Sequence, residues 1–208
     1  LTPLIGTVFG IMYYYNLKEF TELLLSQPIK RTTIILDQYL GLCLSLSMSL
    51  VLGLGIPFLL YGIMESSEIW NFASLLLVGF FLTFIFVAFA FNIAMLNDNK
   101  IKGFGFAILL WLFFAVIYDG IFLISLMVFH EYPLAEYSLL SSILNPIDLS
   151  RILILLKLDI SVLLGYTGAV FHQFFGSIIG MSVSFASLVL WILLPCCKML
   201  YMVKRKDF

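Results

Sequence analysis

Charged residues are scarce in this chain. Asp, Glu, Lys and Arg make up 11% of its 208 residues and hydrophobic residues make up 62%, whereas globular domains are about 25% charged and about 45–50% apolar. A water-soluble protein of this size could not cover so much apolar surface with so few charges. The composition therefore excludes a soluble enzyme, a nucleic-acid-binding protein and a disordered tail. The formal net charge of −1 gives no sign of a polyanionic partner.

Cysteines are also few. The three present, Cys43, Cys196 and Cys197, are too few and too awkwardly placed for a disulfide framework. Cys196 and Cys197 with Met199 and Met202 offer soft ligands that suit Cu(I). Adjacent cysteines on a helix point in different directions, however, and Met is a common apolar filler. We therefore expect no metal site here.

Residues for catalysis are lacking as well. The two histidines, His130 and His172, could meet near Glu131, but isolated histidines are more often interfacial side chains. The chain has no Gly-x-x-x-x-Gly-Lys-Ser/Thr loop for nucleotide phosphates. No Ser/His/Asp set or paired carboxylates support hydrolysis. We expect neither catalytic residues nor a cofactor in this chain, which is therefore not expected to be an enzyme.

Long apolar runs are what the sequence has in excess. A helix needs roughly 20 apolar residues to cross the hydrocarbon core of a bilayer. Runs that reach or approach this length cover 4–15, 34–61, 72–96, 104–129 and 177–200. Because backbone groups in lipid must be satisfied within a segment, these runs predict helices. The whole chain, 1–208, is predicted to be one all-α transmembrane domain with five spans.

The first apolar run, 4–15, is about half a span long. No initiator Met and no charged segment precede it. We therefore expect that an N-terminal helix is missing and that the natural bundle has six spans.

Basic residues predict the orientation of the chain. If the connections alternate between the two sides, nine of the eleven Lys and Arg residues fall on one side. These are Lys18, Lys30, Arg31, Lys100, Lys102, Lys198, Lys204, Arg205 and Lys206. The positive-inside rule makes this side cytoplasmic, together with the C-terminus and the connections 16–33 and 97–103. Segments 62–71 and 130–176 then face outward, and we expect a bacterial inner-membrane protein.

The connection 16–33 contains a short amphipathic pattern. Phe20, Leu23 and Leu24 recur at helical spacing, with Glu19 and Glu22 among them. The proline after Gln27 disfavours helix at that residue and ends or bends the segment. Such a helix, joined to two spans, could transmit force from a soluble partner. It could equally be an interfacial helix that only caps the bundle.

The outward segment 130–176 carries a helix start. Asn145 is suited to be the N-cap, with Pro146 at the first helical position and Asp148 near the positive helix end. Apolar residues then share one face, while Asp148, Arg151 and Lys157 can stay in water. We expect helices that lie on or dip into the outer interface. A sixth crossing over 149–170 is the alternative, but its charged residues make it costly.

Two of these segments resemble a known family. The run Leu-Leu-Ser-Gln-Pro-Ile-Lys-Arg at 24–31, preceded by Glu-Phe-Thr-Glu at 19–22 and followed by Tyr-Leu-Gly-Leu at 39–42, resembles the first cytoplasmic loop of ABC-2-type transporter permeases. Asn-Pro-Ile-Asp at 145–148 with Arg151 resembles the outer loop of the branch associated with nitrous-oxide-reductase maturation and gliding motility. The family has six spans, so the likeness covers nearly all of this chain.

This resemblance implies a half-transporter that forms a homodimer or pairs with a related permease and carries two ATPase subunits on its cytoplasmic face. ATP and Mg²⁺ would be bound by those partner subunits. In the family, the helix of the first loop is the coupling helix, seated in a groove of the ATPase. Carried over to this chain, the coupling residues are Lys18, Glu19, Phe20, Glu22, Leu23, Leu24, Ser26, Gln27, Pro28, Lys30 and Arg31.

Asp119 is the acid within the fourth run. A central Asp costs about 2.5–3.5 kcal/mol on the insertion scale, which some twenty apolar neighbours outweigh. Asp119 could line a substrate path or a subunit contact. The alternative is a protonated or partnered side chain toward the outer leaflet.

Two glycine pairs have the spacing that permits close helix approach. Gly6 and Gly10 form one pair, and Gly176 and Gly180 form the other. Either pair could form the dimer contact, or it could pack within the chain.

Two other function classes stay open. One is a membrane scaffold or assembly subunit that anchors other components without moving anything. The other is an ion-coupled secondary transporter with Asp119 as its ion site, although such proteins usually have discontinuous helices at midspan. The sequence does not identify the substrate or the direction of transport.

Overall fold

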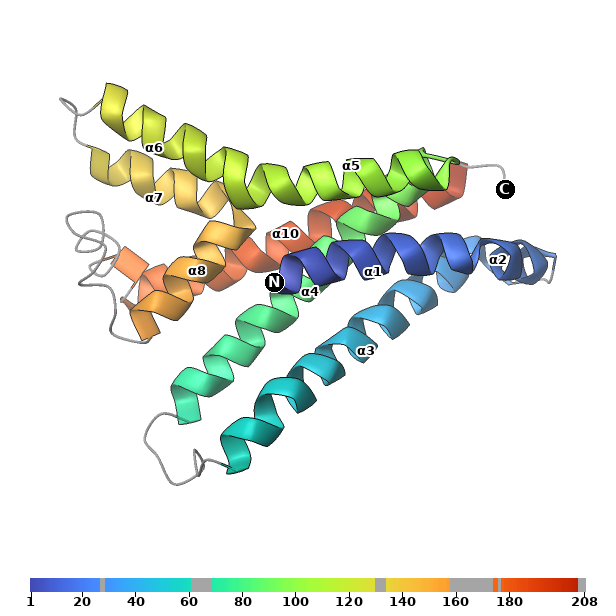
Figure 1. Cartoon of the computed structure of the whole chain (residues 1–208), viewed down its shortest axis with the longest axis horizontal. Coiled ribbons are helices and arrows are strands. Elements are labelled where there is room, and N and C mark those ends of the chain that lie inside the picture. The colour runs from blue at the N-terminus through green and yellow to red at the C-terminus, as the bar shows by residue number, and fades with distance from the viewer. Residues whose placement is uncertain (27–28, 61–68, 130–133, 158–173, 176, 206–208) are drawn as a thin grey trace. The chain divides into compact units, whose positions relative to one another are not determined.

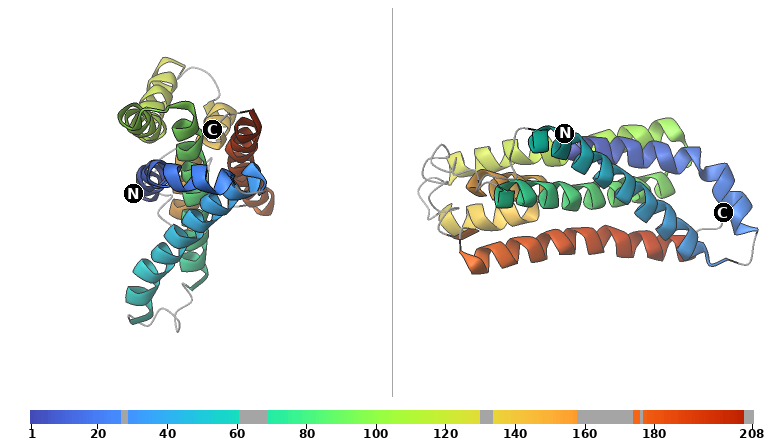
Figure 2. Two further views of the ribbon diagram at one scale, coloured as in Figure 1. Left: turned by 90° about the vertical axis from the view of Figure 1, so that its right-hand side faces the viewer. Right: turned by 90° about the horizontal axis from the view of Figure 1, so that it is seen from below.

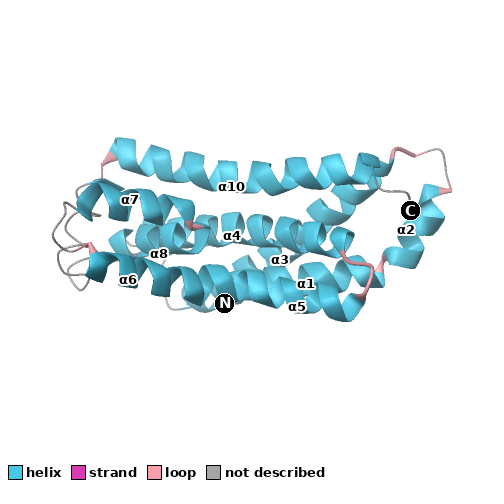
Figure 3. Ribbon diagram, turned by 90° about the horizontal axis from the view of Figure 1, so that it is seen from above, coloured by secondary structure: helices cyan, strands magenta, loops and turns pink. Residues whose placement is uncertain are grey.

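The computed structural model describes residues 1–26, 29–60, 69–129, 134–157, 174–175 and 177–205. Every regular element in these ranges is a helix, as the secondary-structure colouring shows (Figure 3). The predicted all-α polytopic membrane fold is confirmed. The helices are α1 (Thr2–Asn16), α2 (Lys18–Leu25), α3 (Arg31–Leu60), α4 (Ile69–Leu96), α5 (Lys100–Leu112), the π-helical turn η2 (Phe113–Ile117), α6 (Tyr118–Val128), α7 (Leu134–Leu144), α8 (Pro146–Lys157) and α10 (Ile178–Arg205).

Four helical stretches of the described chain are long and apolar enough to cross a membrane. They are Arg31–Leu60, Ile69–Leu96, Lys100–Val128 and Ile179–Arg205, and they match four of the five predicted runs. The remaining run forms α1, whose 15 residues are about three quarters of a span. The bent pair α7–α8 would be a fifth span if its two helices are counted as one. The alternative crossing at 149–170 lies largely outside the described residues.

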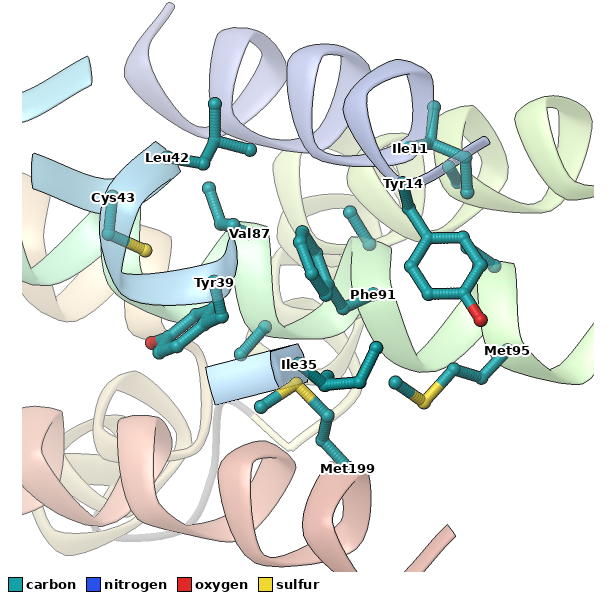
Figure 4. Packing of buried hydrophobic residues seen from close by; sticks show 14 of the residues in the cluster. Ile11, Tyr14, Ile35, Tyr39, Leu42, Cys43, Val87, Phe91, Met95 and Met199 are labelled. Carbon is teal, nitrogen blue, oxygen red and sulfur yellow. The ribbon is translucent and has the colours of Figure 1, made fainter. Parts of the chain in front are cut away.

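The chain divides into two compact units, and the first comprises Leu1–Tyr61, Gly79–Trp111 and Trp191–Phe208. Within it the chain reverses direction through α2, so that α3 returns beside α1 (Figures 1 and 2). The core of this unit surrounds α4. Phe91 is fully buried and meets the rings of Tyr14 and Tyr39 edge to face, at centroid distances of 5.6 and 6.0 Å (Figure 4). Met199 of α10 is buried in the same cluster.

Small residues bring α1 and α4 close together in the first unit. The α-carbon of Gly6 faces Phe86 and Thr83, and that of Gly10 faces Ala90 and Val87. A Cβ atom built on Gly10 would lie 2.7 Å from the Cβ of Ala90, which is well inside the ordinary carbon contact of about 3.5–4.0 Å. Both glycines are buried, and an intrachain contact accounts for their spacing.

The second unit comprises Gly62–Val78 and Leu112–Leu190. Within it α7 runs along α6. The hydroxyl of Tyr118 donates to the carbonyl of Ser141 at 2.6 Å, and the rings of Phe122 and Tyr137 stack at 6.3 Å. The chain then bends by 113° between α7 and α8. The bend lies at Asn145, directly before the proline that begins α8.

Candidate functional site

The predicted coupling segment forms the helix α2, which is joined closely to α1. Only Leu17 separates the two helices, and backbone hydrogen bonds continue across it, from the Leu17 N–H to Tyr13 and from the Thr21 N–H to Leu17. At its C-terminal end, the hydroxyl of Ser26 donates to the carbonyl of Leu23 at 2.7 Å. Backbone hydrogen bonding is therefore continuous from α1 into α2, and the chain bends at Leu17.

One face of α2 is held against the rest of the first unit. Thr21 is 5% exposed, and its hydroxyl accepts a hydrogen bond of 2.8 Å from the side-chain amide of Gln38 in α3. The ammonium group of Lys18 lies 3.9 Å from the carboxylate of Asp98, between α4 and α5. The hydroxyl of Tyr15 donates to the carbonyl of Asn97 in the same connection. These contacts tie α2 to the ends of three membrane helices.

The opposite edge of α2 is apolar and exposed. Leu23 is 69% exposed and Phe20 is 54% exposed, with the exposed carboxylates of Glu19 and Glu22 beside them in sequence. Leu24, which the sequence grouped with Phe20 and Leu23, is half-buried. Surface helices normally turn their large apolar residues toward the core. Among the α2 side chains that the structure describes, the buried one is Thr21, and the large apolar side chains of Phe20 and Leu23 are exposed.

The remaining predicted coupling residues lie at the start of α3 or outside the described part. Lys30 and Arg31 are exposed where α3 begins. Gln27 and Pro28 lie outside the described residues.

Basic side chains gather at the same end of the first unit as α2. Lys100 donates to the side-chain carbonyl of Asn16 at 3.0 Å, which places the start of α5 beside the end of α1. The C-terminal end of α10 lies there as well (Figure 1), because Val203 is buried in the cluster that contains Tyr14 and Ile35. This end therefore carries Lys18, Lys30, Arg31, Lys100, Lys102, Lys198, Lys204 and Arg205. This clustering agrees with the prediction that successive connections alternate between the two sides of the membrane, with these basic residues on one side.

The second unit contains a partly buried charge cluster that includes Asp119. The guanidinium of Arg151 donates to Asp119 Oδ2 at 2.8 Å, and it lies 3.4 Å from Asp148 Oδ1. The side chain of Asp119 is 28% exposed and that of Arg151 is 50% exposed. Asp148 was expected to stay in water, and this expectation is wrong, because Asp148 is buried. An apolar span can hold Asp119 because a cation from α8 accompanies it.

The π-helical turn connects this cluster to the membrane helix. In a π-helix the hydrogen bonds are shifted by one residue, and such turns are frequent at functional sites. The side-chain amide of Asn145 donates to the carbonyl of Phe114 in η2 and to Asp148 Oδ2, both at 2.9 Å. Its side-chain carbonyl accepts from the N–H of Ile147 at 3.0 Å, which is the predicted N-cap bond. The fully buried Asn145 therefore satisfies three groups at once.

The position of Phe114 shows how far along the membrane helix the bend between α7 and α8 lies. The helix Lys100–Val128 has 29 residues, and Phe114 lies about 21 Å from its end at Val128, at a rise of 1.5 Å per residue. Asn145 therefore lies beside the middle of a helix long enough to span the bilayer. The sequence-based expectation that 130–176 lies on the outer side stays a prediction.

The other candidate residues are not brought together into a site. Gly180 packs on the backbone of Phe174 and Phe175 within the second unit, while Gly176 lies outside the described residues, as do His130, Glu131 and His172. Cys196 is half-buried and Cys197 exposed. Among the residues that the structure describes, no three His, Cys, Asp or Glu side chains are arranged to hold a metal ion.

Comparison with known proteins finds a distant and partial similarity. No protein-family model matches the chain. It is 29% identical over 140 residues to the protein described as "Probable ABC transporter permease protein NosY" of Stutzerimonas stutzeri, and the alignment covers 63% of this chain. The chain spans about half, 49%, of the length of that relative. The similarity supports a general relationship to ABC transporter permeases.

Proposed function

We propose that this chain is the membrane-spanning permease subunit of an ATP-driven transporter of the ABC-2 type, and that α2 is its coupling helix. The observation that carries the proposal is the exposed apolar edge of Phe20 and Leu23 on a helix whose other face is anchored. An ATPase subunit with an apolar groove would cover this edge. The likeness of the loop sequence to the nitrous-oxide-reductase-maturation and gliding-motility branch supports the finer assignment.

Force applied to α2 would reach several membrane helices directly. The helix continues into α1 through Leu17, bonds to α3 through Thr21 and Gln38, and pairs with Asp98 after α4 through Lys18. A displacement of α2 by a closing ATPase pair would therefore move these helix ends together. A partner held only by flexible loops could not transmit motion in this way.

The nucleotide chemistry would belong to the partner. The chain contains no loop of the P-loop type, so ATP and Mg²⁺ would be bound by the ATPase, and this chain would not be the enzyme. Two permease chains and two ATPase subunits would form the complete transporter. The basic end of the first unit, with α2 and the C-terminus, would face the cytoplasm of a bacterial inner membrane.

The proposal is tested by disrupting the exposed edge of α2. The tagged full-length protein is purified from native membranes, and its co-purifying ATP-binding chain and ATPase activity are measured. Leu23→Asp is expected to abolish both, because a carboxylate would be desolvated in the ATPase groove. Leu60→Asp at the other end of α3 is the matched control, since Leu60 is 82% exposed, and it should leave both unchanged. Full ATPase binding by Leu23→Asp would overturn the proposal.

A further inference from the structure

In the part of the chain that the structure describes, the charge cluster of the second unit consists of two acidic groups and one basic group. Asp119 and Asp148 contribute two carboxyl groups, and Arg151 contributes one guanidinium. If all three were ionised, the cluster would carry a net charge of −1 beside an apolar membrane helix. An uncompensated charge in low-dielectric surroundings is costly, and two carboxylates that share a site do not both ionise readily.

The hydrogen bonds of the cluster leave one oxygen atom unsatisfied. Arg151 bonds to Asp119 Oδ2, and Asn145 bonds to Asp148 Oδ2. Among the residues that the structure describes, none donates a hydrogen bond to the buried Asp148 Oδ1, and Asp148 as a whole is only 9% exposed. The guanidinium of Arg151 lies 3.4 Å from this oxygen. Buried polar atoms normally have a hydrogen-bond partner, so an ionised carboxylate oxygen at this position would be unfavourable.

The two carboxyl groups flank the same guanidinium nitrogen, because Arg151 Nη1 lies 2.8 Å from Asp119 Oδ2 and 3.4 Å from Asp148 Oδ1. An ionised carboxylate only accepts hydrogen bonds, whereas a protonated one also has an O–H to donate. A hydrogen bond between Asp119 and Asp148 therefore requires one proton. That proton would also make the cluster neutral.

We propose that the Asp119–Asp148 pair is a proton-binding site, which holds one proton between the two carboxyl groups next to Arg151. The proton sits on Asp148 Oδ1 and is donated to Asp119, so the oxygen without a partner gains one. Among the described residues, Tyr118 of α6 also faces Asp148, and Tyr137 of α7 faces Tyr118. The partial exposure of Asp119 and Arg151 gives the proton a route to solvent.

Proton release would act on the contact between α8 and the π-helical turn. Without the proton, the cluster regains its net negative charge and loses the bond between Asp119 on α6 and Asp148 on α8. The bond from Asn145 to Phe114 would remain. This site is independent of the α2 docking proposal, because it lies in the other unit.

Infrared spectroscopy on the full-length protein in lipid nanodiscs tests the site. At pH 7 a solvated Asp, with a pKa of about 3.9, is ionised. The wild type should nevertheless show the carbonyl band of a protonated carboxyl group. The band should disappear reversibly as the pH is raised, with a tenfold change in the protonated-to-ionised ratio per pH unit. This titration needs no variant and so does not depend on how well one folds.

Variants then assign the band. It should be absent in Asp148→Asn and in Asp119→Asn, because each leaves a single carboxylate paired with Arg151. Asp98→Asn, which changes an exposed carboxylate of the first unit, is the matched control and should keep the band. The proposal is overturned if the wild type lacks the band at pH 7, if sodium ions replace the proton there, or if both cluster variants retain it.

Discussion

The contact between α1 and α4 gives a prediction whose size follows from the structure. In Gly10→Ala the new methyl group would lie 2.7 Å from the Cβ of Ala90. Because Ala90 Cβ is bonded directly to the α4 backbone, no flexible side chain can move aside, and the helices must separate by about 1 Å to reach normal contact. Gly41→Ala in α3 is the matched control, since a Cβ there meets nothing within 4 Å.

Both substitutions replace a helical glycine by alanine and gain the same backbone term of up to about 1 kcal/mol. Their difference therefore isolates the cost of overpacking, typically about 1–3 kcal/mol. For a protein of this size that corresponds to roughly 2–12 °C in the thermal midpoint. Because only Leu17 lies between α1 and α2, a shifted α1 should also displace α2.

Thermal unfolding of a fluorescently tagged protein, followed by size-exclusion chromatography in detergent, measures this difference. Gly10→Ala should unfold at a lower temperature than Gly41→Ala. Equal midpoints for the two variants would refute the close packing of α1 on α4.

Three further substitutions test other contacts. Arg151→Gln should lower the free energy of unfolding, and with it the thermal midpoint, more than Asp119→Asn does. The expected difference is about 1–2 kcal/mol for a partly exposed pair, because Arg151→Gln removes the guanidinium that both carboxyl groups contact. The reverse order would contradict the contacts of the cluster. Asn92→Ala removes the 2.8 Å hydrogen bond to the Pro195 carbonyl. It should lower the free energy of unfolding by about 0.6–1.7 kcal/mol, measured by the same assay. An unchanged midpoint would mean that this hydrogen bond does not contribute to stability. Gln38→Leu should speed amide hydrogen exchange in α2 roughly fivefold, because the lost hydrogen bond to Thr21 stabilises α2 by about 1 kcal/mol. Exchange in α5 serves as the internal reference. Unchanged exchange in α2 would show that Gln38 does not anchor this helix.

Hydropathy predicted most of the fold because membrane insertion depends on local composition. Runs of about 20 apolar residues favour membrane-spanning helices, and four of the predicted runs form helices that are long and apolar enough to cross a membrane. The N-cap at Asn145 was equally local, since its bond to Ile147 spans two residues. These features need no knowledge of distant contacts.

The contacts of Asp119 could not be predicted in the same way. Its partner Arg151 is 32 residues away in sequence, and the two meet because α7 and α8 bend at Asn145. The π-helical turn at Phe113–Ile117 leaves no mark in the composition of an apolar helix. Asp148 was placed in water because it lies off the apolar face of its helix, but helical periodicity does not show what packs against the polar face. The signal that was available was the occurrence of Asp119 in a span and of a basic residue, Arg151, in the amphipathic segment 146–157.

The amphipathic pattern of α2 predicted a helix but not what covers it. Periodicity groups Phe20 with Leu23, yet it does not say whether the rest of the chain or another protein lies against them. In the structure Thr21 faces α3 and the two apolar residues are exposed. The pattern also left a purely interfacial helix open, and only a direct contact with a partner separates the two interpretations.

A photo-crosslinking residue placed at Leu23 in the full-length protein, in native membranes, tests the central claim most directly. We expect it to capture an ATP-binding protein, with a yield that changes when ATP is added. The same residue at the buried Thr21 or at Leu60 should not capture that protein. Crosslinks from Leu23 to lipid alone, or to the chain itself, would contradict the assignment of α2 as the helix that docks an ATPase.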